Sequence, residues 1–365
     1  MRKPILLSAG GTGGHLFPAF ALAEELTRRG RIVDVVTDER GDRYSADFPG
    51  RAMHQVPSAT LASNSPIAVA GTVATLGRGV LKARALLKQL GPSVVIGFGG
   101  YPTFPPLVAA RLAGIPSIIH EANAIMGRAN GMLLKRVTAM AASWEGTRNV
   151  PDSELGKVHV TGNPVRDAVI AAASTPYPAL TRTTEFRLLV FGGSQGARFF
   201  SDTVPPALVA LPDAARRRLR VFQQCREEDL ERVQAAYQHS GIKVDLAPFF
   251  MDLPQRMAAS HLVIARAGAS SVSELAVLGR PSILVPLPHA LDNDQLNNAT
   301  RLAEAGAAWC IEQKSLTPQR LASEIMTLID SPERLRAAAV AAKRVGKPDA
   351  VRKLADLVEQ LAGAS

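Results

Sequence analysis

A short apolar run followed by a glycine-rich turn occurs twice in this chain, about half the chain length apart. Ile5–Ser8 leads into the glycines of residues 10–14, and Phe186–Val190 leads into the glycines of residues 192–196. Gly10 and Gly192 are 182 residues apart in a chain of 365. An apolar strand that ends in a glycine turn and opens a helix is typical of parallel α/β domains. The repetition therefore predicts two similar α/β domains in tandem.

Apolar runs of strand length alternate with helical patterns along the rest of the chain. Most of these runs are apolar without interruption, which is typical of strands buried on both faces of a parallel sheet. We predict an α/β fold with doubly wound parallel sheets. The predicted strands are Pro4–Ser8, Ile32–Thr37, Ser93–Phe98, Ser117–His120, Val137–Ala141, Phe186–Phe191, Arg220–Gln224, His261–Ala265 and Ser282–Val285. The join between the domains is expected between Asn163-Pro164 and Phe186, where residues 171–184 are rich in Pro, Ser and Thr.

The composition excludes several classes of protein. Hydrophobic residues make up 47% of the chain and charged residues 20%, which is a globular mixture. Cys225 and Cys310 are far apart and form no CxxC, so we expect a reducing compartment and neither disulfides nor zinc. We expect no signal peptide and no transmembrane helix, because no uncharged apolar stretch reaches 18 residues. The net charge of +10 favours phosphates or an anionic membrane surface, and with 5% aromatics we expect no nucleic-acid partner.

Glycine loops follow three of the predicted strands, at residues 10–14, 97–100 and 192–196. Such a loop exposes backbone N–H groups at the positive end of a helix, where a phosphate binds well. The dinucleotide fingerprint GxGxxG fails, because its sixth position is Leu16, although Asp38 keeps a nicotinamide cofactor open. No loop contains the Gly-Lys-Ser/Thr of a Walker motif. A nucleotide diphosphate held by backbone and hydroxyl groups is the remaining interpretation.

Two side chains near these loops can accept a proton. His15 comes at a helix start directly after the first glycine loop, and the positive end of a helix favours neutral, proton-accepting imidazole. A capping or packing role is the alternative for His15. Glu121 follows the predicted strand Ser117–His120 and is a rival base.

Three further polar residues have both a structural and a functional interpretation. Ser194 is either a helix N-cap or a diphosphate ligand. Glu274 forms the capping box S-x-x-E with Ser271, but it also follows the carboxyl end of a strand, where ligands collect. Asp292 is predicted to be the N-cap of a helix that runs to Glu304, in preference to a D-x-D metal site with Asp294.

Residues 67–90 have apolar positions at helical spacing with Arg78, Lys82, Arg84 and Lys88 outside that seam. Several glycines weaken a single long helix here, so we expect two shorter ones. A basic, partly apolar surface of this kind binds an anionic membrane reversibly.

Five motifs together resemble the MurG family, the UDP-N-acetylglucosamine transferases that make lipid II in peptidoglycan synthesis. They are "GGTGGH" at 10–15, "HEAN" at 120–123, "TGNPVR" at 161–166, "GGSQGA" at 192–197 and "GASSVSE" at 268–274. The resemblance runs from about residue 5 to residue 345. It implies a GT-B fold, in which two Rossmann-like domains face a cleft. The implied domains are residues 1–165 and 166–345, with a C-terminal helix at 346–365 that packs back on the N-terminal domain.

The resemblance also implies site residues, matched position by position. The implied catalytic candidates are His15 and Glu121. The implied donor-binding residues are Thr12, Gly13, Gly14, Asn123, Arg166, Ser194, Phe250 through its backbone, Ala269, Ser270, Ser271, Val272, Ser273, Glu274 and Gln295. The implied acceptor-binding residues are Gly99, Gly100 and Tyr101. Ala122 and Asp294 depart from the family, which has glutamine at both positions.

The implied enzyme is an inverting glycosyltransferase. It moves N-acetylglucosamine (GlcNAc) from UDP-GlcNAc to the C4 hydroxyl of N-acetylmuramic acid in undecaprenyl-linked lipid I, without a metal or other cofactor. The resemblance implies a role in cell wall biogenesis, cell shape and cell division, a peripheral place at the cytoplasmic face of the inner membrane, and a cell-wall synthesis complex. The alternatives are a GT-B glycosyltransferase with another acceptor, a nicotinamide-dependent oxidoreductase and a non-catalytic membrane-surface module.

Overall fold

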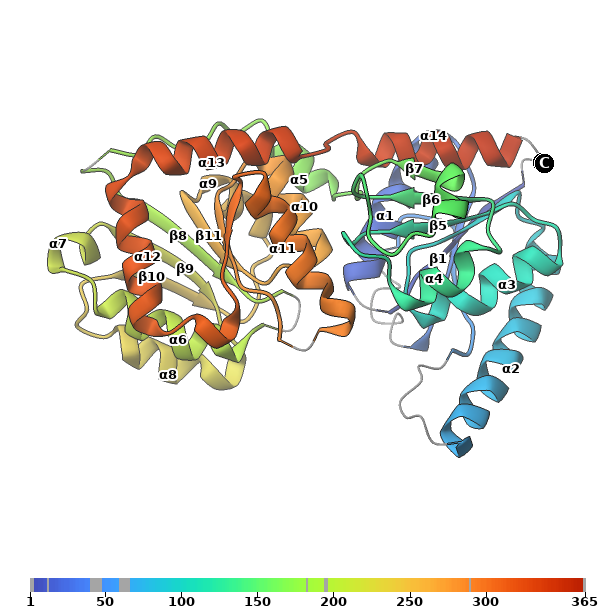
Figure 1. Cartoon of the computed structure of the whole chain (residues 1–365), viewed down its shortest axis with the longest axis horizontal. Helices are drawn as coiled ribbons and strands as arrows, with labels where there is room; N and C mark the ends of the chain where they lie inside the picture. Colours follow the sequence, from blue (N-terminus) through green and yellow to red (C-terminus); the bar gives the residue numbers. More distant parts are fainter. Residues whose placement is uncertain are drawn as a thin grey trace. The chain divides into compact units, whose positions relative to one another are not determined.

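A computed structural model of the chain describes residues 3–11, 13–39, 48–58, 66–181, 183–193, 196–288 and 290–363. The chain divides into two compact units (Figure 1). Unit 1 comprises Met1–Arg166 and Pro348–Ser365, and unit 2 comprises Asp167–Lys347. The C-terminal segment therefore belongs to the unit that contains the beginning of the chain.

Unit 1 is built on a seven-stranded sheet in which every paired strand is parallel. The order of its strands is β3-β2-β1-β4-β5-β6-β7. The strands are β1 (Ile5–Ser8), β2 (Val33–Thr37), β3 (Ala52–Gln55), β4 (Val94–Gly97), β5 (Ser117–Glu121), β6 (Ala139–Ala142) and β7 (Val158–Val160). The helices are α1 (Gly13–Arg28), α2 (Pro66–Leu90), α3 (Phe104–Leu112), α4 (Arg128–Leu134) and α14 (Ala350–Gly363), with short 3₁₀ turns η2 (Tyr101–Thr103) and η3 (Asp152–Lys157).

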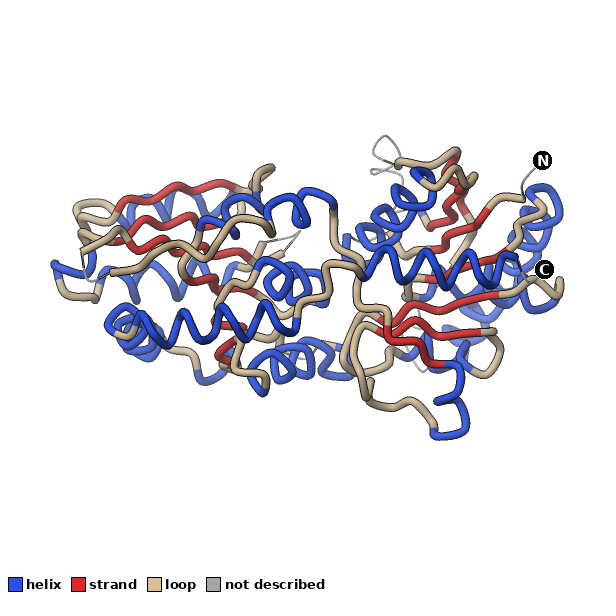
Figure 2. The backbone as a smooth tube through the Cα atoms, turned by 90° about the horizontal axis from the view of Figure 1, so that it is seen from above, coloured by secondary structure: helices blue, strands red, loops and turns tan. Residues whose placement is uncertain are grey.

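Helices cover both faces of this sheet, which explains why interior strands such as β1 and β4 are apolar along nearly their whole length (Figure 2). Along β1, Ile5 and Leu7 point into a core shared with α1 and α14. Leu6 points the other way, into a core shared with α2, α3 and α4. Successive side chains of a strand alternate between faces, so a strand covered on both sides has no polar face.

The C-terminal helix α14 completes one of these two cores. Its buried residues Leu354 and Val358 lie in the same cluster as the apolar face of α1. At the rim, the Arg29 guanidinium donates to Asp356 Oδ1 at 2.6 Å and to Glu359 Oε2 at 2.9 Å. An amphipathic helix needs an apolar surface to cover, and unit 1 supplies it.

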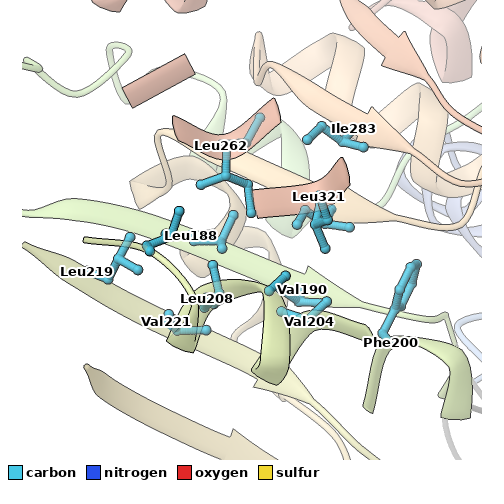
Figure 3. Close-up of a cluster of buried hydrophobic side chains, with 14 of the residues drawn as sticks. Leu188, Val190, Phe200, Val204, Leu208, Leu219, Val221, Leu262, Ile283 and Leu321 are labelled. Carbon is cyan, nitrogen blue, oxygen red and sulfur yellow. The ribbon is translucent and has the colours of Figure 1, made fainter. Parts of the chain in front are cut away.

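Unit 2 repeats the plan with a six-stranded parallel sheet in the order β10-β9-β8-β11-β12-β13. Its strands are β8 (Phe186–Phe191), β9 (Leu219–Gln224), β10 (Lys243–Ala247), β11 (Leu262–Ala265), β12 (Ser282–Leu284) and β13 (Ala308–Cys310). Its helices are α5 (Asp167–Ala172), α6 (Arg198–Val209), α7 (Asp213–Arg216), α8 (Leu230–Tyr237), α9 (Leu253–Ala259), α10 (Ala269–Leu278), α11 (Asp294–Glu304), α12 (Pro318–Asp330) and α13 (Pro332–Val345). Its 3₁₀ turns are η4 (Glu227–Asp229), η5 (Leu291–Asn293) and η6 (Gln313–Ser315). Figure 3 shows Leu188, Val190, Val204 and Leu208 in the core between this sheet and its helices.

The predicted α/β class with two doubly wound sheets is confirmed. All nine predicted strands are present; β8 has the predicted bounds, and the ends of the others differ by at most two residues. The four strands that the sequence patterns missed, β3, β7, β10 and β13, are the outermost strands of the two sheets. These edge strands are half-buried for most of their length, and three of them contain His, Gln, Lys or Asp. A strand with one neighbour does not need the apolar run by which the interior strands were recognised.

The expectation of two short helices between residues 67 and 90 is wrong, because α2 is a single helix of 25 residues. Gly79 allows this helix to pack closely. A Cβ atom there would come within 2.3 Å of the Pro57 carbonyl oxygen and 3.0 Å of Pro105 in α3. Packing against α3 therefore offsets the weak helix propensity of the glycine. In the described part of the chain, no helix combines the length and hydropathy needed to cross a bilayer.

Candidate active site

Each sheet has one place where the strand order reverses direction, and the glycine loops lie there. In unit 1, β1 pairs with both β2 and β4, so the loops after β1 and β4 leave the sheet side by side. In unit 2, β8 pairs with both β9 and β11, and the loops after β8 and β11 are neighbours in the same way. Ligands of doubly wound sheets bind at such switch points, outside the carboxyl ends of the strands. The folds therefore define one candidate site in each unit.

The imidazole of His15 lies between the two loops at the switch point of unit 1. A Cβ atom added at Gly10 would come within 3.1 Å of its ring, at Gly99 within 3.3 Å and at Gly100 within 3.4 Å. Gly99 and Gly100 have φ of 87° and 76°, values that favour glycine. The ring thus packs in space that exists because three neighbours have no side chain. His15 is half-buried in the first turn of α1, beside the candidate acceptor residues Gly99 and Gly100.

Tyr101, the third candidate acceptor residue, begins η2 directly after these glycines. Thr103 donates from Oγ1 to the Gly100 carbonyl oxygen at 2.8 Å, which holds the turn. Gly13 and Gly14 begin α1 on the other side of His15. Thr12 lies outside the described residues.

Glu121, the rival base, is 2% exposed at the end of β5. Its Oε1 accepts from the Asn123 backbone at 3.0 Å and from Asn123 Nδ2 at 3.2 Å. Its Oε2 accepts from the Gly127 backbone at 2.9 Å and from Asn130 Nδ2 at 2.8 Å. Burial raises the pKa of Glu121, although these hydrogen bonds favour the ionised form.

His120 lies beside Glu121 in β5 and is 1% exposed. Burial lowers its pKa to about 4, and the nearby His15 contributes in the same direction. Its Nε2 contacts the Gly162 carbonyl oxygen at 3.3 Å. His120 is therefore neutral near pH 7 and has a packing role, which sequence patterns did not indicate.

Arg166, the last residue of unit 1, also lies close to the first loop. Its guanidinium carbon is 5.2 Å from the centre of the Phe17 ring in α1, a cation–π distance. A Cβ atom at Gly13 would come within 3.0 Å of the same ring. Arg166 thus brings a positive charge to the beginning of α1.

In unit 2, Gln224 organises the second glycine loop, and the sequence reasoning did not identify it. From the end of β9, its Oε1 accepts from the Gly192 backbone at 3.0 Å. Its Nε2 donates to the carbonyl oxygens of Gly193 at 3.1 Å and Pro248 at 3.0 Å. One side chain therefore fixes the candidate diphosphate loop and the segment that contains Phe250. A glutamine at the carboxyl end of an apolar strand was the available signal. Ser194 lies outside the described residues.

Phe250 is 6% exposed, with its ring 4.3 Å from the Arg256 guanidinium. Because the ring is packed in this way, the backbone of Phe250 is the part that can form hydrogen bonds with a nucleotide base.

The first turn of α10 contains the candidate residues Ala269, Ser270, Ser271, Val272 and Ser273. The capping box, which was the structural alternative for Glu274, does not form, because the N-cap is Gly268 and no side chain caps the helix. Ser273 instead donates from Oγ to the Ala269 carbonyl oxygen at 2.8 Å. The buried Ser270 hydroxyl has no hydrogen-bond partner among the described residues. Glu274 is 5% exposed.

Gln295 in α11 connects the loop after β11 with the loop after β12. Its Oε1 accepts from the backbones of Ala267 at 3.2 Å and Leu287 at 3.0 Å. One turn later, Asn298 donates from Nδ2 to the Ala267 carbonyl oxygen at 3.1 Å. The Gln295 oxygen therefore has a structural role, and its NH₂ group is the part suited to bind a ligand.

Asp292 does not cap α11 as expected. It has φ of 58° in η5, and the N-cap is Asn293. Burial, with a further contribution from Asp292, raises the pKa of Asp294. Among the residues with described positions, no group of three or more His, Cys, Asp or Glu side chains is arranged to hold a metal ion.

Arg266, directly after β11, is a second residue that the sequence reasoning missed. It is 8% exposed, and its guanidinium donates to the carbonyl oxygens of Val285 and Pro286 at 3.1 Å and to Gln313 Oε1 at 2.6 Å. It also lies 5.2 Å from the Phe200 ring in the first turn of α6. Burial lowers its pKa to about 10. Arg266 therefore holds the segment after β12 and places a positive charge beside the first turn of α6.

Family models match both units. Residues 5–142 match the glycosyltransferase family 28 N-terminal domain, and residues 187–354 match the glycosyltransferase family 28 C-terminal domain. Curated relatives cover nearly the whole chain. One from Mesorhizobium japonicum is 53% identical over 361 residues, which are 99% of this chain and 96% of the relative. One from Rhizobium johnstonii is 51% identical over 98% of this chain and 95% of the relative. Both are named UDP-N-acetylglucosamine–N-acetylmuramyl-(pentapeptide) pyrophosphoryl-undecaprenol N-acetylglucosamine transferase.

Solved structures agree with the fold. MurG of Acinetobacter baumannii aligns with a TM-score of 0.79 and 29% identity, covering 98% of this chain and 99% of the other. The glycosyltransferase VinC, in complex with dTDP, and a UDP-GlcNAc 2-epimerase from Neisseria meningitidis each align with a TM-score of 0.67. The alignment with VinC covers all of both chains. The alignment with the epimerase covers 98% of this chain and all of the epimerase. At 16% identity, these two show the GT-B-like fold alone.

The two Rossmann-like sheets, each with a glycine loop at its switch point, define a nucleotide-sugar enzyme of the GT-B class. The chain belongs to glycosyltransferase family 28, and its sequence relatives of known name are MurG enzymes. It is a glycosyltransferase, so the alternatives of a nicotinamide-dependent oxidoreductase and a non-catalytic membrane module are wrong.

Proposed function

We propose that this chain transfers GlcNAc from UDP-GlcNAc to the C4 hydroxyl of N-acetylmuramic acid in lipid I, which gives lipid II. The observation that carries the proposal is 53% identity, over nearly all of both chains, to a relative named for this reaction. Both candidate sites support it, because each presents backbone donors at a switch point to a phosphate-bearing substrate.

The donor nucleotide is assigned to unit 2. The loop from Gly192 to Ala197, with the Ser194 hydroxyl, holds the diphosphate, and the beginning of α10 from Ala269 to Ser273 lies along the nucleotide. The unpartnered Ser270 hydroxyl supports this, since a buried hydroxyl without a partner is costly unless a ligand supplies one. The backbone at Phe250 meets the uracil.

The sugar of the donor is assigned to two side chains of unit 2. Glu274 accepts hydrogen bonds from sugar hydroxyls, and the Gln295 NH₂ group donates one, since its oxygen holds two loops.

The acceptor is assigned to unit 1. Gly99, Gly100 and Tyr101 bind the acceptor, and Thr12, Gly13, Gly14 and Asn123 face the reacting sugar. His15 takes the proton of the C4 hydroxyl as that oxygen attacks the anomeric carbon from the face opposite UDP. The new glycosidic bond forms as the bond to UDP breaks, so the configuration at the anomeric carbon inverts. Arg166, backbone N–H groups and helix termini stabilise the departing diphosphate, so the mechanism needs no metal or other cofactor.

The acceptor lipid requires contact with a membrane, and α2 has the surface for it. The described side chains Arg78, Lys82, Arg84 and Lys88 are exposed, together with the apolar Val73 and Leu81 at 63% and 69%. Figure 1 shows α2 extending outward from the rest of unit 1. We assign residues 67–90 to a peripheral contact with the anionic cytoplasmic face of the inner membrane. A cell-wall synthesis complex is a further proposed partner.

The test is UDP release by the purified chain with UDP-GlcNAc and a soluble lipid I analogue. We expect turnover that depends on both substrates and persists in EDTA. Turnover with a different acceptor, and none with the lipid I analogue, would establish another family 28 specificity instead.

A further inference from the structure

The carboxylate of Glu121 has no acceptor site left for a substrate proton. A carboxylate accepts about four hydrogen bonds, two on each oxygen. At Glu121, the backbone and side chain of Asn123 occupy Oε1, while the Gly127 backbone and the Asn130 side chain occupy Oε2. A general base needs an open lone pair that reaches the reacting hydroxyl. The geometry of Glu121 is therefore that of a support for the loop after β5 and for the beginning of α4.

The four donors come from a single connection between β5 and α4. Asn123 and Gly127 lie in the loop of residues 122–127, and Asn130 lies in the first turn of α4. Asn130 Nδ2 also donates to the His120 carbonyl oxygen at 3.1 Å, which joins the helix to the end of the strand. The buried carboxylate of Glu121 thus holds the loop after β5 and the beginning of α4 against the end of β5.

The same asparagine lies near the loop that holds His15. Asn130 Nδ2 is 3.9 Å from the point where a Gly99 Cβ would lie, and the His15 ring is 3.3 Å from that point. Strand pairing explains this proximity, since β4 and β5 are neighbours and the residues after them meet at one sheet edge. The side chain of Asn130, which Glu121 holds, and the ring of His15 therefore both border the space beside Gly99.

We infer that Glu121 is a positioning residue, which holds Asn123 and the Gly99 loop in place around His15 and takes no proton from the substrate. The inference rests on the proposed function for its kinetic readout and on the hydrogen bonds alone for its structural readout.

The experiment compares Glu121→Gln with Glu333→Gln, a control that removes a carboxylate from an exposed position in the first turn of α13. Glutamine keeps one acceptor oxygen but turns an NH₂ group toward two donors. We expect kcat/KM to fall on the order of 10²-fold through misplacement. We expect KM to rise and the acidic limb of the pH profile to keep its midpoint. Backbone amides of residues 122–130 should exchange hydrogen about tenfold faster. The control should match the wild type in all three measurements.

Two results would overturn the inference. One is loss of the acidic limb in Glu121→Gln while KM and hydrogen exchange stay at wild-type values, which is the signature of a base. The other is a variant equal to the wild type in both kinetics and exchange.

A second variant keeps the test independent of folding and of substrate. Asn130→Ala removes one of the four donors and should shift exchange and KM in the same direction by a smaller factor. If the wild type transfers no GlcNAc to the lipid I analogue, the proposed function fails. Hydrogen exchange in the two variants still decides the inference, because unchanged protection of residues 122–130 would overturn it.

Discussion

At the scale of single residues, the site of unit 1 depends on glycines, which leave space for a neighbouring ring because they have no side chain. His15 packs against Gly10, Gly99 and Gly100, two of which have positive φ. A side chain at either of the latter would be strained as well as close to the ring. The sequence shows these glycines as two separate loops 85 residues or more apart, and pairing of β1 with β4 brings them to one imidazole.

We expect His15→Ala to lower kcat on the order of 10²- to 10⁴-fold, because the attacking hydroxyl loses its base. The affinity for UDP, measured by calorimetry, should stay within about twofold, since we assign the nucleotide site to unit 2. His159→Ala, an exposed histidine of β7, is the matched control. Normal turnover of the His15 variant would reduce this histidine to a packing role.

Asp34 sets a pH dependence of stability in unit 1. Its side chain is fully buried in β2, where Arg51 Nε donates to Oδ1 at 3.0 Å and Arg51 Nη2 to Oδ2. Burial opposes ionisation, but the His54 imidazole, whose Nε2 lies 3.7 Å from Oδ1, and the hydrogen bonds from Arg51 outweigh it and hold the pKa of Asp34 below its usual value. Because the folded pKa is the lower one, this carboxylate stabilises the fold above its ordinary pKa. The contribution is lost as the pH falls through the folded pKa.

We therefore expect Arg51→Met to unfold at a lower temperature than the wild type near pH 7. The two unfolding temperatures should converge as the pH falls below about 4, where the wild type loses the same interaction. Thermal unfolding followed by circular dichroism between about pH 3 and 7 measures this. Arg111→Met, at an exposed position of α3, is the control. A constant difference at every pH would contradict the assignment to Asp34.

At the scale of elements, α2 contains glycines with different surroundings. Exposed Gly77 has no atom within 4 Å of an added Cβ, whereas Gly79 lies against Pro57 and Pro105. Helix propensity treats the two alike, so the sequence alone predicts the same effect for both.

We expect Gly77→Ala to raise the free energy of unfolding by roughly 1 kcal/mol, because alanine loses less backbone entropy in a helix. Gly79→Ala should lower it by about 1–3 kcal/mol, because the methyl group forces α2 away from its neighbours. Urea unfolding of the two variants, side by side, measures the difference. Equal effects would mean that α2 does not pack at Gly79.

The edge strands of the two sheets, like the glycines of α2, could not be predicted from a local sequence pattern. Interior strands could be predicted from sequence because burial on both faces leaves a continuous apolar run, as in β4. The outer strand β10 begins with Lys243 and contains Asp245, so its pattern gives no such signal. Whether a polar segment becomes an edge strand depends on a neighbour distant in sequence.

At the scale of the whole molecule, the chain leaves unit 1 once and returns to it at its end. Sequence pattern predicts a helix for the last segment but does not say which unit it covers. Contact with α1 and the ion pairs of Arg29 assign α14 to unit 1. The stability of unit 1 therefore depends on residues that follow all of unit 2.

We expect Leu354→Ala to destabilise unit 1 by about 2–5 kcal/mol, because this fully buried side chain fills the core beneath α14. Scanning calorimetry should show one transition lowered, while UDP at about 100 times its dissociation constant adds roughly 2.7 kcal/mol to the other. Val340→Ala, 61% exposed on α13, should change neither. A single transition that responds to both leucine truncation and UDP would show that the units unfold together.

The sequence by itself determined the α/β class, the interior strands and the glycine loops, because apolar runs and glycine turns are local signals of burial and backbone conformation. Its motifs also identified the family. Only the tertiary structure decided which loops meet at each switch point, that Glu121 is saturated by its own loop and α4, and that Gln224 holds the second glycine loop while Arg266 holds the segment after β12. The physical reason is that a polar side chain's role depends on its partners. Parallel strand order and register bring those partners together from distant parts of the chain.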